Sequence, residues 1–330
     1  MRPTWSAQEY ADGIRANNRV VLSRAITLAE STRPEHQTLA EQVIQLLLTG
    51  PQSARPSLRI GITGAPGAGK STFIEALGSL LIEQGHRVAV LAIDPSSQVS
   101  RGSILGDKTR MERLSASEQA FIRPSPAGSS LGGVARKTRE TILLVVAAGY
   151  DVVLVETVGV GQSEIAAHSM TDVFVLLLLP GAGDELQGIK RGIVEMADLI
   201  VVNKADGERQ KLANQARAHY LNATHLLPPK ASGYAPQVLA CSALEGSGIQ
   251  EVWQTLLRYR QHVGDNGFWG KNRQQQALYW MREHLEARLR EVFYQQTQVS
   301  QALAALQPEV TAGRMSPFAA AERVLAAFRC

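Results

Sequence analysis

The sequence predicts an α/β fold with a doubly wound, mostly parallel sheet and helical segments at both ends of the chain. Near-continuous apolar runs, typical of strands buried on both faces, alternate with helical patterns between about residues 57 and 262. A glycine-rich loop separates the first apolar run from the helical pattern that follows it, as in a βαβ unit. Helical periodicity alone marks the residues before and after this region.

Residues 1–56 are expected to form a helical N-terminal arm. Apolar residues recur at helical spacing in residues 18–32 and 36–50, and the pattern ends at the Gly50-Pro51 pair. Residue types typical of a catalytic site do not cluster in this arm. We therefore expect it to cap or brace the domain that follows.

Residues 57–262 are expected to form the sheet domain. Its second and third apolar runs are separated by 56 residues that include a helical pattern, so they are predicted to be parallel neighbours and not a hairpin. The helical pattern at residues 134–149 supplies one of the crossovers that such a sheet needs. The predicted strands are residues 58–63, 88–94, 151–157, 173–180, 199–204 and 237–243.

Residues 263–330 are expected to form a helical C-terminal extension. It follows a glycine-rich break at residues 263–270 and ends in a second short helix at residues 318–328. The first helix carries an apolar stripe with a spacing near 3.5 residues. The stripe either packs on the same chain or joins two chains; its members are Leu278, Met281, Leu285, Leu289 and Val292.

Composition excludes several functional classes. The net charge is +4, and the basic residues are interspersed with acidic ones, so we expect no nucleic-acid partner. The two cysteines, Cys241 and Cys330, are too few for a disulfide framework or a thiolate metal cluster. Apolar runs are too short to span a bilayer, and the N-terminus has no signal-peptide or targeting pattern. We expect a cytoplasmic protein without a membrane partner.

The loop GAPGAGKS matches the pattern GxxxxGK[ST] and lies between a predicted strand and a predicted helix. In this context backbone N–H groups face the phosphates, Lys70 reaches the β- and γ-oxygens, and Ser71 offers its hydroxyl to Mg²⁺. The expected nucleotide contacts are Gly64, Ala65, Pro66, Gly67, Ala68, Gly69, Lys70, Ser71 and Thr72.

A second motif, NKAD, predicts that the base is guanine. Asp206 can accept hydrogen bonds from the guanine N1–H and exocyclic amine, whereas adenine presents different groups. The stem of Lys204 can lie along the base, and Asn203 can tie this loop to the phosphate loop. The later CSAL segment offers further contacts to the base from Ser242, Ala243 and Leu244. We expect GTP to be preferred over ATP.

Carboxylates between the two motifs are candidates for binding Mg²⁺. Asp94 ends the second predicted strand, and Glu156 ends the third, where most GTPases carry aspartate. Glu156 is expected to orient Mg²⁺ or its water, and Gly159 to contact the γ-phosphate. Val160 stands where Ras-like enzymes carry the glutamine that orients the attacking water.

Valine cannot hold water by a hydrogen bond, so intrinsic GTP hydrolysis is expected to be slow. Another group must orient the attacking water, with Asp94, Asp107 or a partner residue as the alternatives. Gln162 would need a rearranged loop to do so and is the weaker option.

Six motifs together resemble the MeaB, MMAA and ArgK family of GTPases, which are chaperones of adenosylcobalamin-dependent methylmalonyl-CoA mutase. The similarity extends over nearly the whole chain, and the strand order expected is similar to that of the signal-recognition, MinD and BioD class. The motifs are GAPGAGKST, AIDPSSQVSRGSILGDKTRM, ETVGVGQSE, LLLPGAGDELQGIKRGI, NKAD and CSALEGSGI. The resemblance implies a homodimer formed through the C-terminal extension, in which GTP gates cofactor loading and protects the mutase.

The resemblance also implies residue roles. Lys70 binds phosphate and Ser71 binds the metal, while Asp94, Asp107 and Glu156 match the family's acidic residues around Mg²⁺ and the water. Within residues 180–192 it implies a further switch that relays the nucleotide state to the mutase, through Asp184, Glu185 and Lys190.

Two other functions stay open. A nickel-delivering metallochaperone GTPase would share the core, but such proteins bind metal through Cys and His clusters, and the seven His residues here are dispersed. A protein kinase of a transport system, the function suggested by the ArgK name, is the second alternative. It would transfer the γ-phosphate to a protein, whereas a GTPase timer releases all of it as inorganic phosphate.

Overall fold

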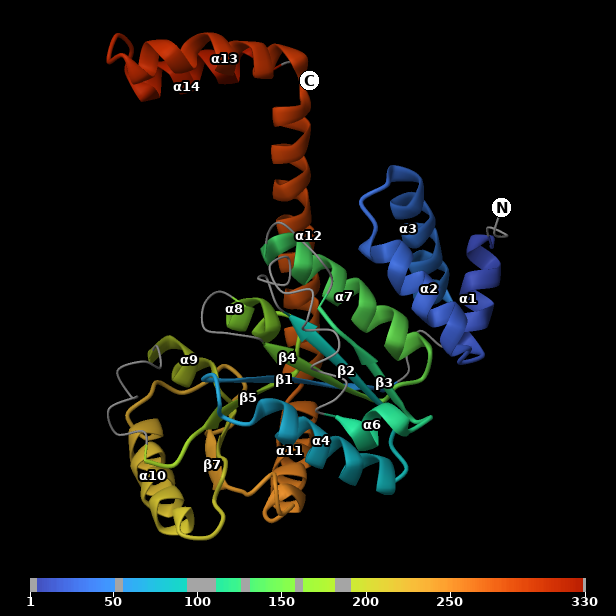
Figure 1. The fold of residues 1–330 in the computed structure, drawn as a ribbon, viewed down its shortest axis with the longest axis vertical. Helices are drawn as coiled ribbons and strands as arrows, with labels where there is room; N and C mark the ends of the chain where they lie inside the picture. The colour runs from blue at the N-terminus through green and yellow to red at the C-terminus, as the bar shows by residue number, and fades with distance from the viewer. Residues whose placement is uncertain are drawn as a thin grey trace. The chain divides into compact units, whose positions relative to one another are not determined.

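The structure, a computed structural model, describes residues 5–50, 56–93, 111–125, 131–157, 163–181 and 191–328. The chain divides into two compact units, residues 1–276 and 277–330. Figure 1 shows the helices and strands of both units. In the described ranges, no helix has the length and apolar character that crossing a bilayer would require.

The first unit is built around one seven-stranded parallel sheet with the order β3-β2-β4-β1-β5-β6-β7. The predicted fold class is confirmed, and each of the six predicted runs contains a strand. The second and third runs, now β2 and β4, are parallel neighbours as expected. The strands are β1 (Leu58–Gly64), β2 (Val88–Ile93), β3 (Ala120–Arg123), β4 (Val152–Thr157), β5 (Val173–Leu178), β6 (Leu199–Val202) and β7 (Gln237–Ala240).

Strand β3 was not expected from the sequence. It has only four residues and lies at the edge of the sheet, paired with β2 alone among the described strands. A run this short, preceded by the five-residue helix α6 (Glu112–Ala116), has no periodicity that distinguishes it from a loop.

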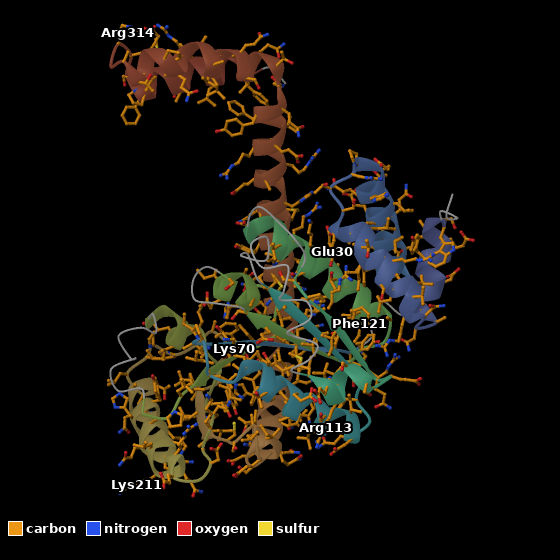
Figure 2. All side chains as sticks on the ribbon, in the orientation of Figure 1. Glu30, Lys70, Arg113, Phe121, Lys211 and Arg314 are labelled. Carbon is orange, nitrogen blue, oxygen red and sulfur yellow. The ribbon has the colours of Figure 1, made fainter. Side chains whose placement is uncertain are left out.

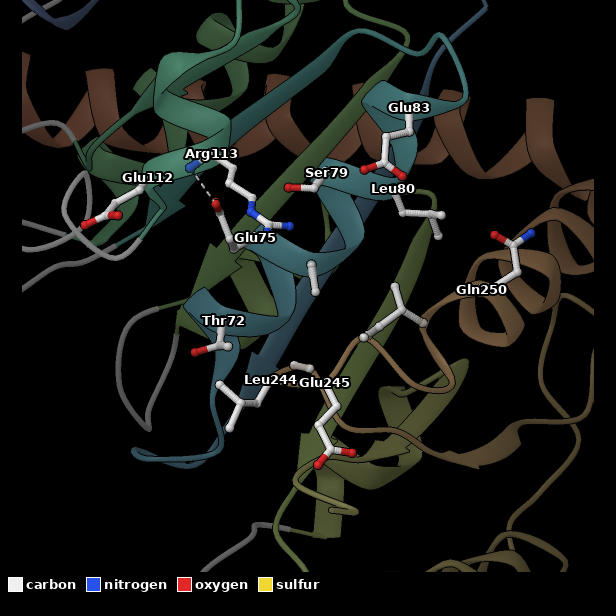
Figure 3. Close-up of a pocket in the computed structure, with 14 residues that line it drawn as sticks. Thr72, Glu75, Ser79, Leu80, Glu83, Glu112, Arg113, Leu244, Glu245 and Gln250 are labelled. Carbon is white, nitrogen blue, oxygen red and sulfur yellow. Dashed lines mark hydrogen bonds between the residues drawn. The ribbon is translucent and has the colours of Figure 1, made fainter. Parts of the chain in front are cut away.

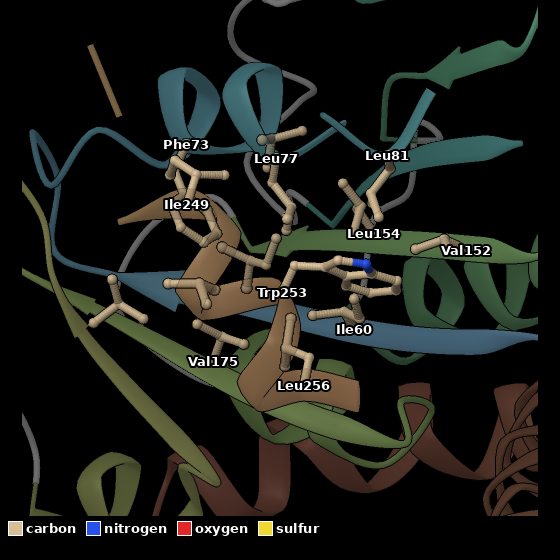
Figure 4. Close-up of a cluster of buried hydrophobic side chains, with 14 of the residues drawn as sticks. Ile60, Phe73, Leu77, Leu81, Val152, Leu154, Val175, Ile249, Trp253 and Leu256 are labelled. Atoms are coloured by element: carbon tan, nitrogen blue, oxygen red, sulfur yellow. The ribbon is translucent and has the colours of Figure 1, made fainter. Parts of the chain in front are cut away.

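One face of the sheet is covered by α4 (Lys70–Glu83), α6 and α11 (Ile249–Asp265), and it holds the main apolar core. Trp253 of α11 is 1% exposed and packs among side chains of α4 and the strands (Figure 4). Strands such as β1 alternate, so that Ile60 and Ile62 join this core while Gly61 faces away. These contacts fix α4, and with it the loop before it, against β1.

The opposite face is covered by α7 (Leu131–Ala147) and α8 (Ser163–His168). The N-terminal arm packs against α7, and the Arg123 guanidinium of β3 donates to the Glu30 carboxylate of the arm at 3.0 Å. The predicted helical character of the arm is confirmed. Its helices are α1 (Ala7–Arg15), α2 (Arg19–Glu30) and α3 (Pro34–Thr49).

Three further helices complete the first unit near β5 to β7. They are α9 (Arg191–Met196), α10 (Arg209–Thr224) and the beginning of α12 (Phe268–Gln295). The Arg273 guanidinium of α12 donates to both Asp172 carboxylate oxygens at 2.7 Å and to the Ser57 carbonyl at 2.7 Å. This charged contact fastens α12 to the starts of β1 and β5, where Asp172 also accepts from the Arg59 backbone N–H.

The second unit contains the rest of α12, α13 (Thr297–Thr311) and α14 (Pro317–Ala327), with α13 packed against α14. Phe293 and Phe328 contact each other with ring centroids 5.2 Å apart. The sequence did not distinguish α13. All five residues of the predicted apolar stripe are exposed in the chain: Leu278, Met281, Leu285, Leu289 and Val292.

Candidate nucleotide-binding site

The glycine-rich loop connects β1 to α4, as the sequence predicts. Gly64 has φ of 155° and Gly69 has φ of 83°, which L side chains rarely adopt. A Cβ at Gly64 would lie 2.4 Å from the Leu177 carbonyl oxygen, and one at Gly69 would lie 2.7 Å from Asn203 Nδ2. The loop therefore approaches both the strand β5 and the NKAD loop too closely for any residue but glycine at these two positions.

Lys70 is the first residue of α4 (Figure 2). Its Nζ donates to the carbonyl oxygens of Gly64 at 2.8 Å and Ala65 at 3.3 Å, which holds the ammonium over the loop. Burial lowers the pKa of Lys70, and the carboxylates of Glu156 and Glu164 oppose this effect. The Lys70 ammonium is thus stabilised by negative charge, which the oxygens of a bound phosphate would also provide.

Ser71 and Glu156, two of the predicted metal residues, are brought together. The Ser71 hydroxyl donates to Glu156 Oε1 at 3.2 Å, and Glu156 is 6% exposed at the end of β4. A hydroxyl and a carboxylate are the hard oxygen donors that Mg²⁺ prefers, so this pair fits the ion. No group of three or more His, Cys, Asp or Glu residues suited to a metal occurs within the described ranges.

Several predicted site residues lie outside the described residues. Asp94 and Asp107 fall within 94–110, and Gly159 falls within 158–162, together with Val160 and Gln162. The predicted relay residues Asp184, Glu185 and Lys190 fall within 182–190.

Asn203 connects the phosphate loop to the two loops expected to contact the base. It is 1% exposed, its Nδ2 donates to the Ala68 carbonyl at 2.8 Å, and its Oδ1 accepts from the Ala243 backbone N–H at 3.0 Å. The link between Asn203 and the phosphate loop is therefore present, as the sequence predicts. One buried amide sets the distance between the phosphate-binding and base-binding ends of the site.

The remaining NKAD residues are also in place. Asp206 Oδ2 accepts from the Ser242 hydroxyl at 2.8 Å, which orients its carboxylate. Lys204 has φ of 61°, and its Cε would lie 3.8 Å from a Cβ built on Gly69. Its stem thus passes beside the phosphate loop, where it can lie along a bound base.

An open cavity of about 580 Å³ extends from the site between α4, α6 and the start of α11 (Figure 3). Thr72 and Leu244, both predicted nucleotide contacts, line this cavity together with Ala243. Its far wall is shaped by Glu75, whose Oε1 accepts from the Arg113 backbone N–H at 2.7 Å. The volume lies within the usual range of small-molecule sites.

The sequence reasoning missed one acidic residue at this site. Glu164, in the first turn of α8, is 1% exposed, and its carboxylate acts on the charge of Lys70. It stands within the ETVGVGQSE motif, so the signal was present, but no spacing rule separates such a carboxylate from an ordinary first-turn acid that favours a helix N-terminus.

Comparison with known proteins identifies the family. The family model described as "Methylmalonyl Co-A mutase-associated GTPase MeaB" matches residues 22–298. GTPase ArgK of Escherichia coli is 50% identical, covering 83% of this chain and 82% of its own. The mouse mitochondrial methylmalonic aciduria type A homolog is 45% identical, covering 96% and 78%.

Among solved structures, the crystal structure of a LAO/AO transport system kinase is similar, with a TM-score of 0.76. It is 38% identical, and the match covers 97% of this chain and 96% of that one. The chain belongs to the MeaB family of P-loop GTPases and hydrolyses GTP.

Proposed function

We propose that this GTPase couples GTP turnover to cofactor loading and protection of an adenosylcobalamin-dependent methylmalonyl-CoA mutase. The observation that carries the proposal is the extent of the family match, because residues 22–298 include both the nucleotide site and the segment after β5. The family description names the mutase, and the mouse relative is named for methylmalonic aciduria.

The sheet offers a route for the signal. Strand β5 pairs with β1 so that Leu177 lies opposite Gly64, the first residue of the phosphate loop. The segment that follows β5 therefore starts beside the phosphates. In this proposal Asp184, Glu185 and Lys190 belong to a switch that changes with the nucleotide and is sensed by the mutase.

Site roles are part of the proposal. Lys70 binds the β- and γ-phosphates, Ser71 and Glu156 hold Mg²⁺ with Asp94 and Asp107, and Asn203, Lys204 and Asp206 bind the guanine. The contact between Ser71 and Glu156 supports the metal assignment. Mg²⁺ would neutralise charge on the phosphates as the bond to the γ-phosphate breaks. Intrinsic hydrolysis is slow in this account and is stimulated by the partner.

We also propose a cytoplasmic homodimer with residues 1–56 as arm, 57–262 as GTPase domain and 263–330 as dimerisation extension. The exposed stripe on α12 supports the dimer, because a row of exposed apolar residues is typical of an interface. Leu285→Glu should shift the protein to monomer in sedimentation. Leu226→Glu, at another exposed leucine, should leave the dimer intact, and equal sedimentation of both variants would contradict the interface.

The chaperone role is tested by measuring GTP hydrolysis with and without the purified mutase of the same organism. We expect faster hydrolysis with the mutase, and cofactor transfer to it that depends on the nucleotide. Lys70→Ala serves as the control, because it should show neither effect. Equal rates with and without the mutase would count against the proposal.

The same assay with GTP labelled in its γ-phosphate separates this role from that of a kinase. A kinase leaves label on an acceptor protein, whereas the proposed GTPase releases all label as inorganic phosphate. Label retained by a transport protein in the presence of this chain would favour the kinase.

A further inference from the structure

Two buried threonines join the ends of the central strands β1 and β4. The Thr157 hydroxyl, at the end of β4, donates to the Thr63 hydroxyl oxygen of β1 at 2.9 Å. Thr63 is 2% exposed and Thr157 is 0% exposed. Thr63 precedes Gly64, the first residue of the phosphate loop, and Thr157 follows Glu156. The hydrogen bond therefore links the two strands where they enter the nucleotide site.

This hydrogen bond extends the connection between β1 and β4 beyond their backbone pairing. Among the described residues, the parallel pairing of the two strands ends at Ile62 and Glu156. One residue further on, the backbone of Thr63 pairs with β5 and the backbone of Thr157 pairs with β2. The two hydroxyls thus hold the strands together at the level where each backbone already pairs with another neighbour.

The position of Glu156 depends on this connection. Successive side chains of a strand point to opposite faces, so Glu156 turns towards α4 and Thr157 turns away from it. Glu156 Oε1 accepts from the hydroxyl of Ser71, in the first turn of α4, at 3.2 Å. Because Ser71 follows the loop that leaves β1, a change in the spacing of β1 and β4 moves Glu156 relative to Ser71.

A pair of hydroxyls allows a closer approach than an apolar pair of the same shape. The two threonine oxygens lie 2.9 Å apart, whereas two methyl carbons in contact lie about 3.5–4.0 Å apart. Valine at both positions would therefore widen the spacing of the strand ends by roughly 1 Å. Mg²⁺ requires a near-ideal octahedral arrangement of oxygen ligands at about 2.0–2.1 Å, so a shift of this size should weaken its binding.

We propose that Thr63 and Thr157 are positioning residues that set the separation of Ser71 and Glu156 for Mg²⁺. The proposal rests on the metal assignment of the proposed function, and it adds two residues that act through the spacing of the strands. Phosphate binding by the loop and base binding by NKAD do not use this separation. We therefore expect the affinity for the metal, and not that for the nucleotide, to depend on the threonine pair.

The test compares Mn²⁺ binding by wild type and by the double variant Thr63→Val, Thr157→Val. Mn²⁺ is the probe because it takes the same oxygen ligands as Mg²⁺, and its binding to the complex with a non-hydrolysable GTP analogue is followed by EPR. We expect Mn²⁺ affinity on the order of tenfold lower in T63V/T157V, as is usual when a residue that orients metal ligands is lost. Affinity for the analogue without divalent metal, measured by calorimetry, should equal that of wild type.

The single variants separate positioning from stability. T63V or T157V alone leaves one buried hydroxyl without its partner, so each should unfold at a lower temperature than wild type and bind Mn²⁺ more weakly. The double variant replaces both hydroxyls by methyl groups and should regain much of that stability, but not the Mn²⁺ affinity. Thr157→Ser keeps the hydroxyl and should bind Mn²⁺ as wild type does.

Thr141→Val is the matched control. Thr141 of α7 is also a buried threonine, at 3% exposure, and its hydroxyl donates to the Lys137 carbonyl at 2.8 Å. T141V should bind Mn²⁺ with wild-type affinity. Glu156→Gln tests the metal assignment itself, since it should lose Mn²⁺ affinity whether or not the threonines position the site.

Three results would overturn the proposal and leave the metal assignment standing. They are wild-type Mn²⁺ affinity in T63V/T157V, an equal loss of Mn²⁺ affinity in T141V, and a loss of analogue affinity as large as the loss of Mn²⁺ affinity. Should the double variant be unfolded, T157V decides, with T157S as its reference. Unchanged Mn²⁺ affinity in E156Q would instead contradict the metal assignment of the proposed function, and this proposal with it.

Discussion

Replacing Asn203 tests how the three nucleotide-binding loops are joined. In Asn203→Ala, the Ala68 carbonyl and the Ala243 N–H each lose their hydrogen bond to the Asn203 amide. The Asn203 side chain is only 1% exposed, so water does not readily replace these two bonds. Leaving one buried polar group without a partner costs about 1–3 kcal/mol, so the two together cost about 2–6 kcal/mol. Movement of the neighbouring loops and entry of water reduce this cost. Part of the remaining cost lowers the free energy of unfolding, and part lowers the affinity for GTP.

We therefore expect N203A to lower GTP affinity by at least tenfold, which corresponds to about 1.4 kcal/mol. It should also lower the free energy of unfolding. Calorimetric titration with GTP and Mg²⁺ measures the affinity, and urea unfolding monitored by fluorescence measures the stability. Wild-type affinity in N203A would refute the reasoning that this amide holds the loops in their binding arrangement.

Asn266, whose side chain is exposed, offers a control with the same two kinds of hydrogen bond. Its Nδ2 donates to the Ser232 carbonyl at 2.9 Å, and its Oδ1 accepts from the Phe268 N–H at 2.9 Å. Asn266→Ala thus removes the same two kinds of hydrogen bond in a part of the first unit away from the nucleotide. It should reduce stability and leave GTP affinity unchanged. An equal loss of affinity in N266A and N203A would show that the effect is general destabilisation.

Three further predictions concern the charges. Lys70→Ala should reduce GTP affinity by at least about 100-fold in calorimetry, because the phosphates lose their closest cation; a smaller loss than tenfold would contradict this. Asp206→Asn should shift preference from GTP towards XTP, whose extra oxygen accepts from an amide, and unchanged competition among GTP, XTP and ATP would mean that another group reads the base. Burial raises the pKa of Glu140 to about 7, with Arg136 opposing and Glu41 adding to the shift. Because the native state then holds this proton more tightly than the unfolded chain does, the free energy of unfolding should fall as pH rises from about 4.5 to 7, and should fall less in E140Q; parallel pH profiles would contradict it.

The sequence predicts the sheet well because its strands are buried on both faces. Runs such as residues 173–178 contain apolar residues only, which leaves little choice of structure. Strand β3 lacks that signal, since Ile122 and Arg123 at the edge of the sheet are partly exposed. A four-residue edge strand is decided by its pairing with β2, which a sequence pattern does not show.

The site is predictable where backbone geometry constrains residue type. Glycine at 64 and 69 and asparagine at 203 follow from the close approach of the phosphate loop to β5 and to the NKAD loop, and these are the positions that the motifs contain. Glu164 was missed because its burial depends on how α8 packs against β1 and β4, which a sequence pattern does not show. The apolar stripe on α12 was predicted as a helix face, but periodicity does not say which surface covers it.

The central claim is that this pocket binds a guanine nucleotide through its phosphate loop and the NKAD loop. Calorimetric titration of the full chain with GTP and with ATP, each with Mg²⁺, tests it most directly. We predict that each chain binds one GTP and that its affinity for ATP is far lower. No heat with GTP, or equal binding of the two nucleotides, would contradict the account.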